Sequence, residues 1–416
     1  MICQISSQLS VKSVVRIMTY TTIQQAFRPL FFTCFIIGLC IYPLNKPTTR
    51  EKWVLYLSIL YSVTLWSIYG YIFYCMVSSL SLAGIFPATI SIVVLENNII
   101  ITMTSTIFNL YYNKRLQMCI KKLSIVDDTL KELGSLKMYQ KIHMWSRRVI
   151  AGWVVCSFGL NFHDTLSWQK YLTIIRKETT FWRFIIAHIY NYSFHINALV
   201  DLVFMFFLWY IGTRFDEINK HIRNLLIKKE HWLKNTWKKP PVTVHQYTLD
   251  IDNYKRVLWS LMHLYLELCR IAREWNMIFR MQMTFEMVSY PLTVTSICYY
   301  LYKLLMNKYG LFIPTIVWCR VVSWLFVFVG KFYIINYICE NVSVKAYTIE
   351  KTINELTNIL RYADVWKEIY QFTLHARQYP LKFTGMGLFN FGNKFLIKFC
   401  ITISTYVIIM IQMSDG

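Results

Sequence analysis

Long uncharged runs dominate the sequence. From Trp53 to Leu95 there is no Asp, Glu, Lys or Arg, which is enough for one membrane-spanning helix of about 20 residues and half of a second. Similar runs recur to the end of the chain. They predict an all-α membrane protein with seven spans, at residues 53–76, 86–112, 149–166, 183–212, 279–302, 309–338 and 395–413.

One further apolar run, residues 30–44, is shorter than a span and contains Pro43 near its end. A run of this length is more typical of a helix on the membrane surface than of an eighth span. We therefore predict a membrane-surface helix in the N-terminal segment 1–52.

The composition agrees with a membrane protein. Apolar residues make up 56% of the 416 residues and charged residues only 16%, whereas a soluble globular chain carries about 25% charged residues. Disordered chains have low hydrophobicity, and a nucleic-acid binder has no need of 17% aromatic residues in long uncharged runs. The net charge of +22 therefore does not indicate a nucleic-acid partner.

The distribution of Lys and Arg predicts the orientation. The segments 1–52, 113–148, 213–278 and 339–394 together hold 34 of the 44 basic residues. The positive-inside rule places these segments and the N-terminus in the cytoplasm, facing the anionic headgroups of membrane lipids. Seven spans then put the C-terminus outside the cell, which is opposite to the topology of G-protein-coupled receptors.

The predicted cytoplasmic segments contain helices of their own. Residues 114–148 and 214–237 have helical patterns, and Pro240–Pro241 closes the second. A heptad stripe then leads without a breaker into the span at 279–302, so this helix should extend well beyond the membrane. The stripe indicates helix packing either within one subunit or between subunits. It consists of Val257, Leu261, Leu264, Leu268, Ile271, Trp275 and Ile278.

Ionisable side chains inside spans are costly and are therefore candidates for function. Glu96, Asp201, Glu286 and Arg320 stand out, and Arg320 is expected to pair with one of the three carboxylates. With nearby polar and aromatic residues they predict a cavity for a small polar ligand. The alternative is a set of interhelical bonds that only fixes packing, above all at Glu96, whose neighbours Asn97 and Asn98 cannot share its face. The additional candidates for ligand binding are Tyr190, His195, Asn197 and Tyr290.

Enzymatic function has no support in the sequence. No serine-hydrolase, zinc-protease, P-loop or dinucleotide motif occurs in a usable context. The eleven cysteines form no CxxC pair or His/Cys cluster, so we expect neither a metal nor a cofactor. The pair His163–Asp164 is expected in an outer loop, in contact with solvent. Cys75 and Cys298 fall near the predicted outer ends of their spans, which leaves a disulfide between them open, although no spacing pattern supports one.

The C-terminal span carries the most specific motif. Thr405-Tyr406, five apolar residues and Gln412 resemble the TYhhhhhQF signature of insect gustatory receptors, where h is apolar. The segment 381–389, LKFTGMGLF, resembles the sequence that precedes the last span of that family. The family's final Phe is Met413 here, which keeps the bulk and the apolar character without the ring.

The resemblance implies a ligand-gated, nonselective cation channel. Family members assemble as homo- or hetero-tetramers, with four copies of the last span around a pore. A small-molecule tastant enters an outward-facing cavity among spans two to six. By the same resemblance, Gln412 stands at the gate, Ile409 forms an apolar constriction one turn below, and Thr405 and Tyr406 hold the span against its neighbours.

Helix geometry agrees with part of this role. Ile409 and Gln412 are three residues apart and share a helix face, so a ring of Ile can gate by dewetting and a ring of Gln can offer oxygens to a cation. The alternative for Gln412 is a cap at the outer end of the helix. The resulting domains are 1–52, a sensing bundle at 53–338, cytoplasmic anchor helices at 339–394 and a pore-forming span at 395–416.

The predicted function is thus a gustatory receptor channel in the plasma membrane of sensory neurons. An odorant receptor or its co-receptor, in the same superfamily, is the nearest alternative. A metabotropic seven-span receptor would need the opposite topology, and no NPxxY motif lies near the last span.

Overall fold

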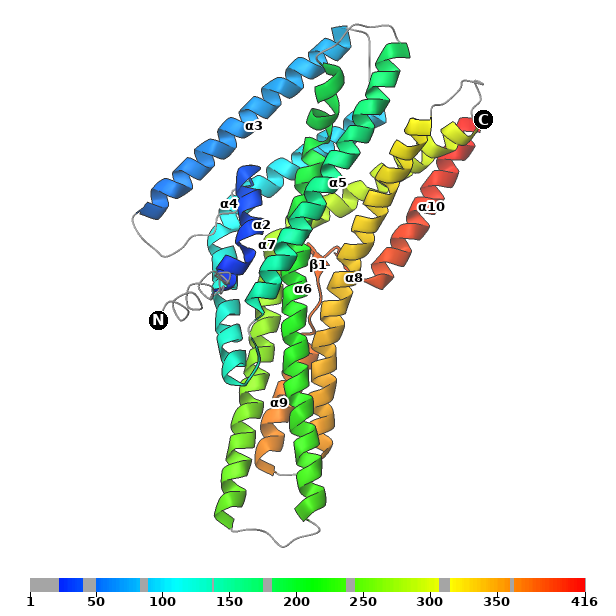
Figure 1. Cartoon of the computed structure of the whole chain (residues 1–416). Coiled ribbons are helices and arrows are strands. Elements are labelled where there is room, and N and C mark those ends of the chain that lie inside the picture. The colour runs from blue at the N-terminus through cyan, green and yellow to red at the C-terminus, as the bar shows by residue number, and fades with distance from the viewer. Residues whose placement is uncertain are drawn as a thin grey trace, which may run out of the picture.

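The computed structural model describes residues 22–39, 50–82, 89–136, 138–174, 182–236, 244–306, 315–359 and 363–415, and nearly all of them are helical (Figure 1). A small antiparallel sheet consists of β1 (Thr384–Gly385) and β2 (Phe389–Asn390). The described helices are α2 (Ile23–Ile36), α3 (Arg50–Leu82), α4 (Thr89–Glu132), α5 (Tyr139–Ile174), α6 (Trp182–Thr236), α7 (Val244–Met306), α8 (Thr315–Ile359), α9 (Ala363–Gln378) and α10 (Asn393–Asp415).

Several helices continue through the predicted membrane boundaries. α6 has 55 residues and α7 has 63, so α7 is about 95 Å long at 1.5 Å per residue. This length confirms the predicted extension of the heptad helix beyond its span. The helical pattern over 114–148 is confirmed on both sides of one turn, because α4 ends at Glu132, Gly134 has φ 96°, and α5 begins at Tyr139.

Four of the described helices are long and apolar enough to cross a membrane by length and composition. The stretches that meet these conditions are Tyr56–Ser78 in α3, Ile185–Leu225 in α6, Thr315–Glu355 in α8 and Asn393–Met413 in α10. They agree with the predicted spans at 53–76, 183–212, 309–338 and 395–413. The count of seven spans and the orientation of the termini stay predictions.

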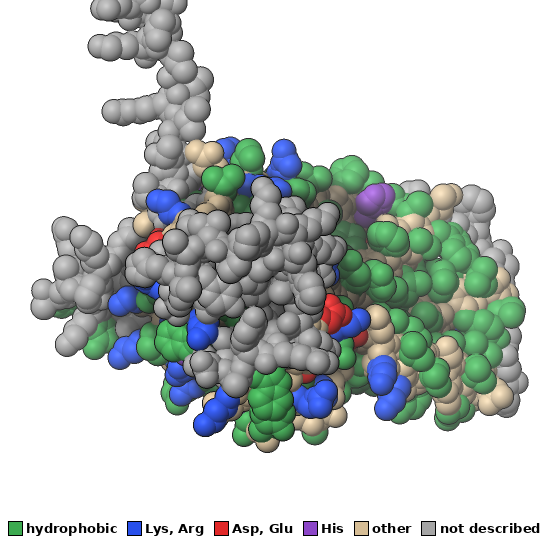
Figure 2. Space-filling view, turned by 90° about the horizontal axis from the view of Figure 1, so that it is seen from below, with side chains coloured by type: hydrophobic (Ala, Val, Ile, Leu, Met, Phe, Trp, Pro, Cys, Tyr) green, Lys and Arg blue, Asp and Glu red, His purple; other side chains and the backbone are tan. Residues whose placement is uncertain are grey.

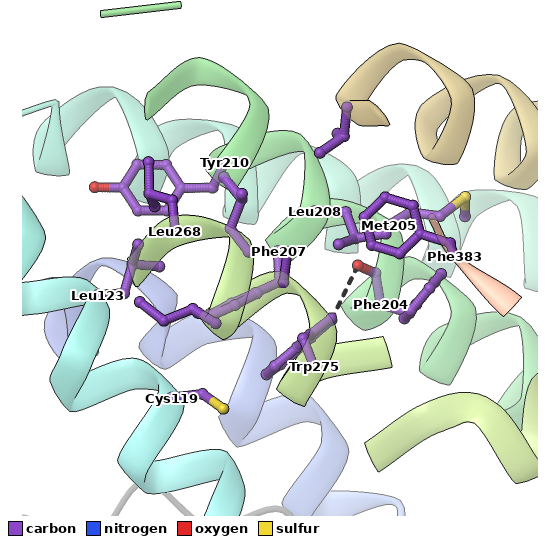
Figure 3. Packing of buried hydrophobic residues seen from close by; sticks show 14 of the residues in the cluster. Cys119, Leu123, Phe204, Met205, Phe207, Leu208, Tyr210, Leu268, Trp275 and Phe383 are labelled. Atoms are coloured by element: carbon purple, nitrogen blue, oxygen red, sulfur yellow. Dashed lines mark hydrogen bonds between the residues drawn. The ribbon is translucent and has the colours of Figure 1, made fainter. Parts of the chain in front are cut away.

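The core lies where α6 and α7 pack against α4 and α8. The heptad stripe of α7 packs there within one chain, with Val257 partly buried and the other six residues buried, so the structure supports the intramolecular alternative. Trp275 is fully buried, and its ring stacks on Phe207 of α6 with centroids 3.6 Å apart. Its indole N–H donates to the carbonyl oxygen of Phe204 at 3.4 Å (Figure 3). Cys119 and Leu123 of α4 complete this region of the core.

Helix α2 is packed into the protein on one side. Phe27 is buried and contacts the rings of Phe206, Phe207 and Tyr210 on α6. Phe32, on another face of α2, is exposed. The helix thus begins earlier than the apolar run 30–44, and residues 40–44 of that run lie outside the described residues. A position at the membrane surface stays a prediction.

A short hairpin connects α9 to α10. The central turn residues Met386 and Gly387 both have positive φ, as the tight turn of a hairpin requires. Gly385 faces the ring of Phe389, where a Cβ would lie 2.4 Å from the nearest ring carbon. α10 then runs along one side of α8, at the edge of the bundle (Figure 1).

The end of the molecule at which α6 ends and α7 begins has many basic side chains. In the view from below, Lys and Arg surround this end more often than Asp and Glu do (Figure 2). This is the end that the sequence assigns to the cytoplasm.

Candidate ligand site and gate

A buried ion-pair triad joins three helices at the depth of the predicted spans. Lys331 of α8 forms ion pairs with Asp201 of α6 and Glu286 of α7. Both carboxylates are buried, and the Lys331 side chain is 13% exposed. The Lys331 ammonium also lies 5.8 Å from the ring centroid of Tyr290, which is one helical turn after Glu286. Buried charges are tolerated only when they are paired, and this arrangement pairs them across α6, α7 and α8.

Aromatic rings surround the triad on the side of α8. Tyr290 contacts Phe328 and Phe332, with centroids 5.9 Å and 5.8 Å apart. Phe328 in turn contacts Trp324 and Phe194. These rings form a continuous apolar layer between α6, α7 and α8.

A second polar network lies between α5, α6 and α8. Its centre is Asp164, which is 1% exposed and forms an ion pair with Arg320 at 2.9 Å. Asp164 also accepts hydrogen bonds from Asn191 at 2.6 Å and from the Trp324 indole at 3.2 Å. Asn191 donates to the side-chain oxygen of Asn161, which also lies 3.0 Å from Nε2 of His195. This sequence of contacts connects His195 to Arg320.

Two sequence predictions are therefore wrong. Arg320 pairs with Asp164 and not with Glu96, Asp201 or Glu286. Asp164 is buried inside a helix of the bundle and not in contact with solvent in an outer loop. Asp164 lies inside the range 149–166 of the third predicted span, and the reason for its burial is that this part of α5 packs against α6 and α8, where Asn191 and Arg320 bind its carboxylate.

The remaining predicted ligand-binding residues are dispersed. Asn197 accepts a hydrogen bond from Thr102 at 3.0 Å and donates to the carbonyl oxygen of Asn98 at 3.2 Å, which joins α6 to α4. Tyr190 is half-buried on α6. Glu96 is exposed while Asn98 is buried, as expected for residues on different helix faces.

The structure thus separates the eight predicted residues into groups. Asp201, Glu286 and Tyr290 meet in the triad region, while Arg320 and His195 belong to the Asp164 network. Lys331 was missed by the sequence reasoning, although the rule that selected Arg320 applies equally to a lysine inside the span at 309–338. Asp164 could not be paired with Arg320 without knowing which face of α5 meets α8.

No group of three His, Cys, Asp or Glu residues among the described residues could hold a metal ion. Neither Cys75 nor Cys298 forms a disulfide with another described residue.

The five candidate gate residues share an exposed surface of α10. Tyr406, Ile409 and Met413 are 52%, 44% and 79% exposed. Thr405 and Gln412 are exposed as well, and the Thr405 hydroxyl donates to the carbonyl oxygen of Ile401 in its own helix. The one buried side chain among those described in α10 is Phe399, which stacks on Phe332 of α8 with centroids 4.0 Å apart. α10 therefore presents most of its surface away from its own subunit.

Long apolar helices, ion pairs buried at bilayer depth and one nearly uncovered span define an all-helical, membrane-embedded protein. The model of the 7tm chemosensory receptor family matches residues 27–415, so the chain belongs to this family. This match confirms the family resemblance that the C-terminal motif indicated.

Individual relatives are more distant. The chain is 22% identical over 326 residues to "Putative gustatory receptor 28b" of Drosophila melanogaster, and the match covers 73% of this chain and 65% of that relative. The fold is similar to that of the insect olfactory receptor OR5 from Machilis hrabei, with a TM-score of 0.62 and 12% identity over 93% of this chain and 99% of that chain. The same receptor in complex with eugenol gives a TM-score of 0.54 and 14% identity, over 94% and 97% of the two chains.

Proposed function

We propose that this chain is a gustatory receptor that acts as a tastant-gated, nonselective cation channel in the plasma membrane of sensory neurons. The observation that carries the proposal is the exposure of α10, a span apolar enough to cross the membrane, of which only 6% of the most apolar stretch is buried. A helix with polar residues on an uncovered surface is suited to contact other subunits and to line a pore.

Four copies of α10 form the pore in this proposal. Ile409 and Gln412 share a face, and both are exposed in the single chain. The apolar ring of Ile409 closes the pore by excluding water, and the ring of Gln412 provides oxygens for the cation. Tyr406 and Met413 contact neighbouring copies, and Thr405 supports the span.

The ligand is a small polar molecule that binds in an outward-facing cavity among the predicted spans two to six. The Asp164 network supports this role, because Arg320 is 31% exposed while its partner Asp164 is buried. The partly exposed guanidinium shares the Asp164 carboxylate with the Trp324 indole, whose ring stacks on His195, so hydrogen-bond donors and aromatic surface occur in one network. Glu96, Tyr190, Asn197 and the triad residues occupy the surrounding helices.

The pore assignment is tested by cysteine substitution. Ile409→Cys and Gln412→Cys, expressed in oocytes, should show a ligand-evoked current that changes when a thiol reagent is added from outside. Ile401→Cys is the matched control, because Ile401 is exposed but lies two turns below Ile409, near the base of α10. Native cysteines such as Cys400 are exposed, so the unsubstituted protein must first show no response to the reagent. A current that is unaffected at both positions would reject the pore role.

An odorant receptor of the same superfamily is the second candidate, favoured by the similarity to the olfactory receptor fold. Recording from oocytes with matched panels of sugars, bitter compounds and volatile compounds separates the two. Ligand-evoked current in cells that lack G-protein signalling separates either channel from a metabotropic receptor.

A further inference from the structure

The base of α10 is attached to α8 at two adjacent places. Phe332 stacks on Phe399 with an interplanar angle of 27° and also contacts Phe395. One turn further along α8, the buried side chain of Asn336 accepts a hydrogen bond from the backbone N–H of Gly392 at 2.9 Å. α10 also contacts α7, so a displacement of this part of α8 relative to α7 changes the contacts that hold the beginning of α10.

The same part of α8 is held from the other side by charge. Lys331, which directly precedes Phe332, is bound to Asp201 of α6 and Glu286 of α7. Tyr290 of α7 contacts both the Lys331 ammonium and the Phe332 ring. The contacts of α8 with α6 and α7, and those of α8 with α10, thus meet at two consecutive residues.

The energy of this triad depends steeply on geometry. Coulomb attraction scales with 1/(εr), and the surroundings of these buried groups have a low effective dielectric constant. A small shift of α8 along α6 or α7 weakens two attractions at once, and the burial of both carboxylates leaves them little contact with water in exchange. The triad therefore favours one position of α8 strongly.

We propose that the Asp201–Lys331–Glu286 triad is a positioning lock that sets the resting position of α10, acting through Phe332 and Phe399. This inference rests on the proposed role of α10 as the pore helix. Lys331 is a positioning residue, since it acts on the gate through its neighbours.

Because the triad has two carboxylates, one of them can be neutralised without leaving the Lys331 charge unpaired. Removing one of them leaves Lys331 with a single carboxylate, so Asp201→Asn or Glu286→Gln keeps a neutral buried pair and a similar side-chain volume. Neither variant leaves an unpaired buried charge, which would be strongly destabilising. Surface biotinylation provides the amount of receptor to which each current is normalised.

The chain offers a matched control. Lys345 and Asp216 also join α8 to α6, with a distance of 2.6 Å, but their side chains are 26% and 54% exposed. Asp216→Asn therefore removes the same type of contact between the same two helices at a solvated position far along α8 from Phe332. Solvent screening makes such a pair weak.

The experiment records basal current and the concentration for half-maximal response, with the panel compound that activates the unsubstituted receptor. We expect Asp201→Asn and Glu286→Gln each to change one of these quantities about fivefold or more, the size typical of coupling between sites, while Asp216→Asn does not. The effect of each triad variant on the current should be smaller in a Phe399→Leu background, because that substitution weakens the contact between α8 and α10. Lys331→Arg keeps the positive charge, so its basal current and half-maximal concentration should stay near those of the unsubstituted receptor. Triad variants within twofold of the unsubstituted receptor, at normal surface level, would overturn the lock.

A second measurement separates this inference from the channel proposal. Hydrogen exchange of the backbone at 393–402 is measured in the purified full chain, without any requirement for current. Faster exchange in the triad variants but not in Asp216→Asn supports the lock, whether or not the unsubstituted receptor conducts. A receptor that shows this exchange pattern but conducts no current would reject only the channel proposal. Equal exchange in all variants of a non-conducting receptor would reject both.

Discussion

Helices α6 and α10 have similar apolar character but opposite surroundings. In α6, 72% of the most apolar stretch is buried inside the subunit, whereas in α10 only 6% is buried. Around α6 lie α4, α5, α7 and α8, which cover its polar residues and pair them. Among the described residues, α10 contacts α7 and α8, and Phe399 near its base is its one buried side chain.

This difference shows that hydropathy does not decide what covers a span. The polar side chains of α6, such as Asp201 and Asn197, need protein partners because lipid offers none. The exposed side chains of α10 include Thr405 and Gln412, and a single chain leaves these without cover. α6 is thus a structural centre of the subunit, whereas α10 depends on what lies outside it.

The largest loss of stability is expected from a substitution in the buried core around α6. Trp275→Ala removes the ring that stacks on Phe207 and leaves a cavity at a fully buried site. We expect a loss of about 3–5 kcal/mol in stability, measured as reduced thermal stability of the purified receptor.

The matched control for this prediction is on α10. Ile408→Ala truncates a side chain that is 55% exposed, so its effect in the single chain should be about 0.5 kcal/mol or less. Equal losses for the two variants would mean that α10 is covered as fully as α6, which in an assembled receptor would indicate contact with a neighbouring copy.

A smaller effect is expected at the joint between the two regions. Gly392 has φ 141°, and a Cβ at this position would lie 2.2 Å from Oε2 of Glu340. Gly392→Ala should cost about 1–3 kcal/mol through backbone strain, and the measurement is the thermal stability of the purified receptor. Gly70→Ala is the control, because its Cβ would meet no atom within 4 Å. A Gly392→Ala variant as stable as this control would contradict the close approach.

The smallest effect is expected at a half-exposed ion pair between α4 and α7. Burial by itself raises the pKa of Glu274, but the hydrogen bond and charge of Lys122, with Arg270, hold this pKa below its ordinary value. A lowered pKa means that the pair stabilises the protein at neutral pH and that this contribution is lost as the pH falls through the lowered pKa.

Glu274→Gln should therefore cost less than about 1 kcal/mol at neutral pH and nothing in acid. The measurement is the difference in thermal stability between the variant and the unsubstituted receptor across this pH range. Glu132→Gln, at an exposed position of α4, is the control. A difference that grows on acidification would give the opposite sign and reject the assignment.

Periodicity and charge spacing predicted much of the fold. The heptad stripe predicted a continuous helix from its first residue into the span at 279–302, and α7 has this continuity. Four of the predicted spans coincide with helices that can cross a membrane. The C-terminal motif identified the family, because its residues are fixed in spacing at one place in the chain.

The partners of the buried charges could not be predicted from periodicity or charge spacing. Asp201 and Glu286 were selected correctly as buried, but their partner is Lys331, 45 residues beyond Glu286. Arg320 was assigned to the wrong carboxylates, because its true partner Asp164 was placed outside the membrane. Each pair depends on which helix faces meet, and a single sequence does not record this.

The sequence by itself determined that this protein is a helical membrane receptor of the chemosensory family, because apolar run length and motif spacing are local properties. Only the tertiary structure decided which helices enclose Lys331 and Asp164, that the heptad stripe packs within one chain and that α10 is left uncovered. These features depend on the rotation and relative height of packed helices. Contacts between residues that are distant in sequence determine this rotation and height, so no single segment of the sequence encodes them.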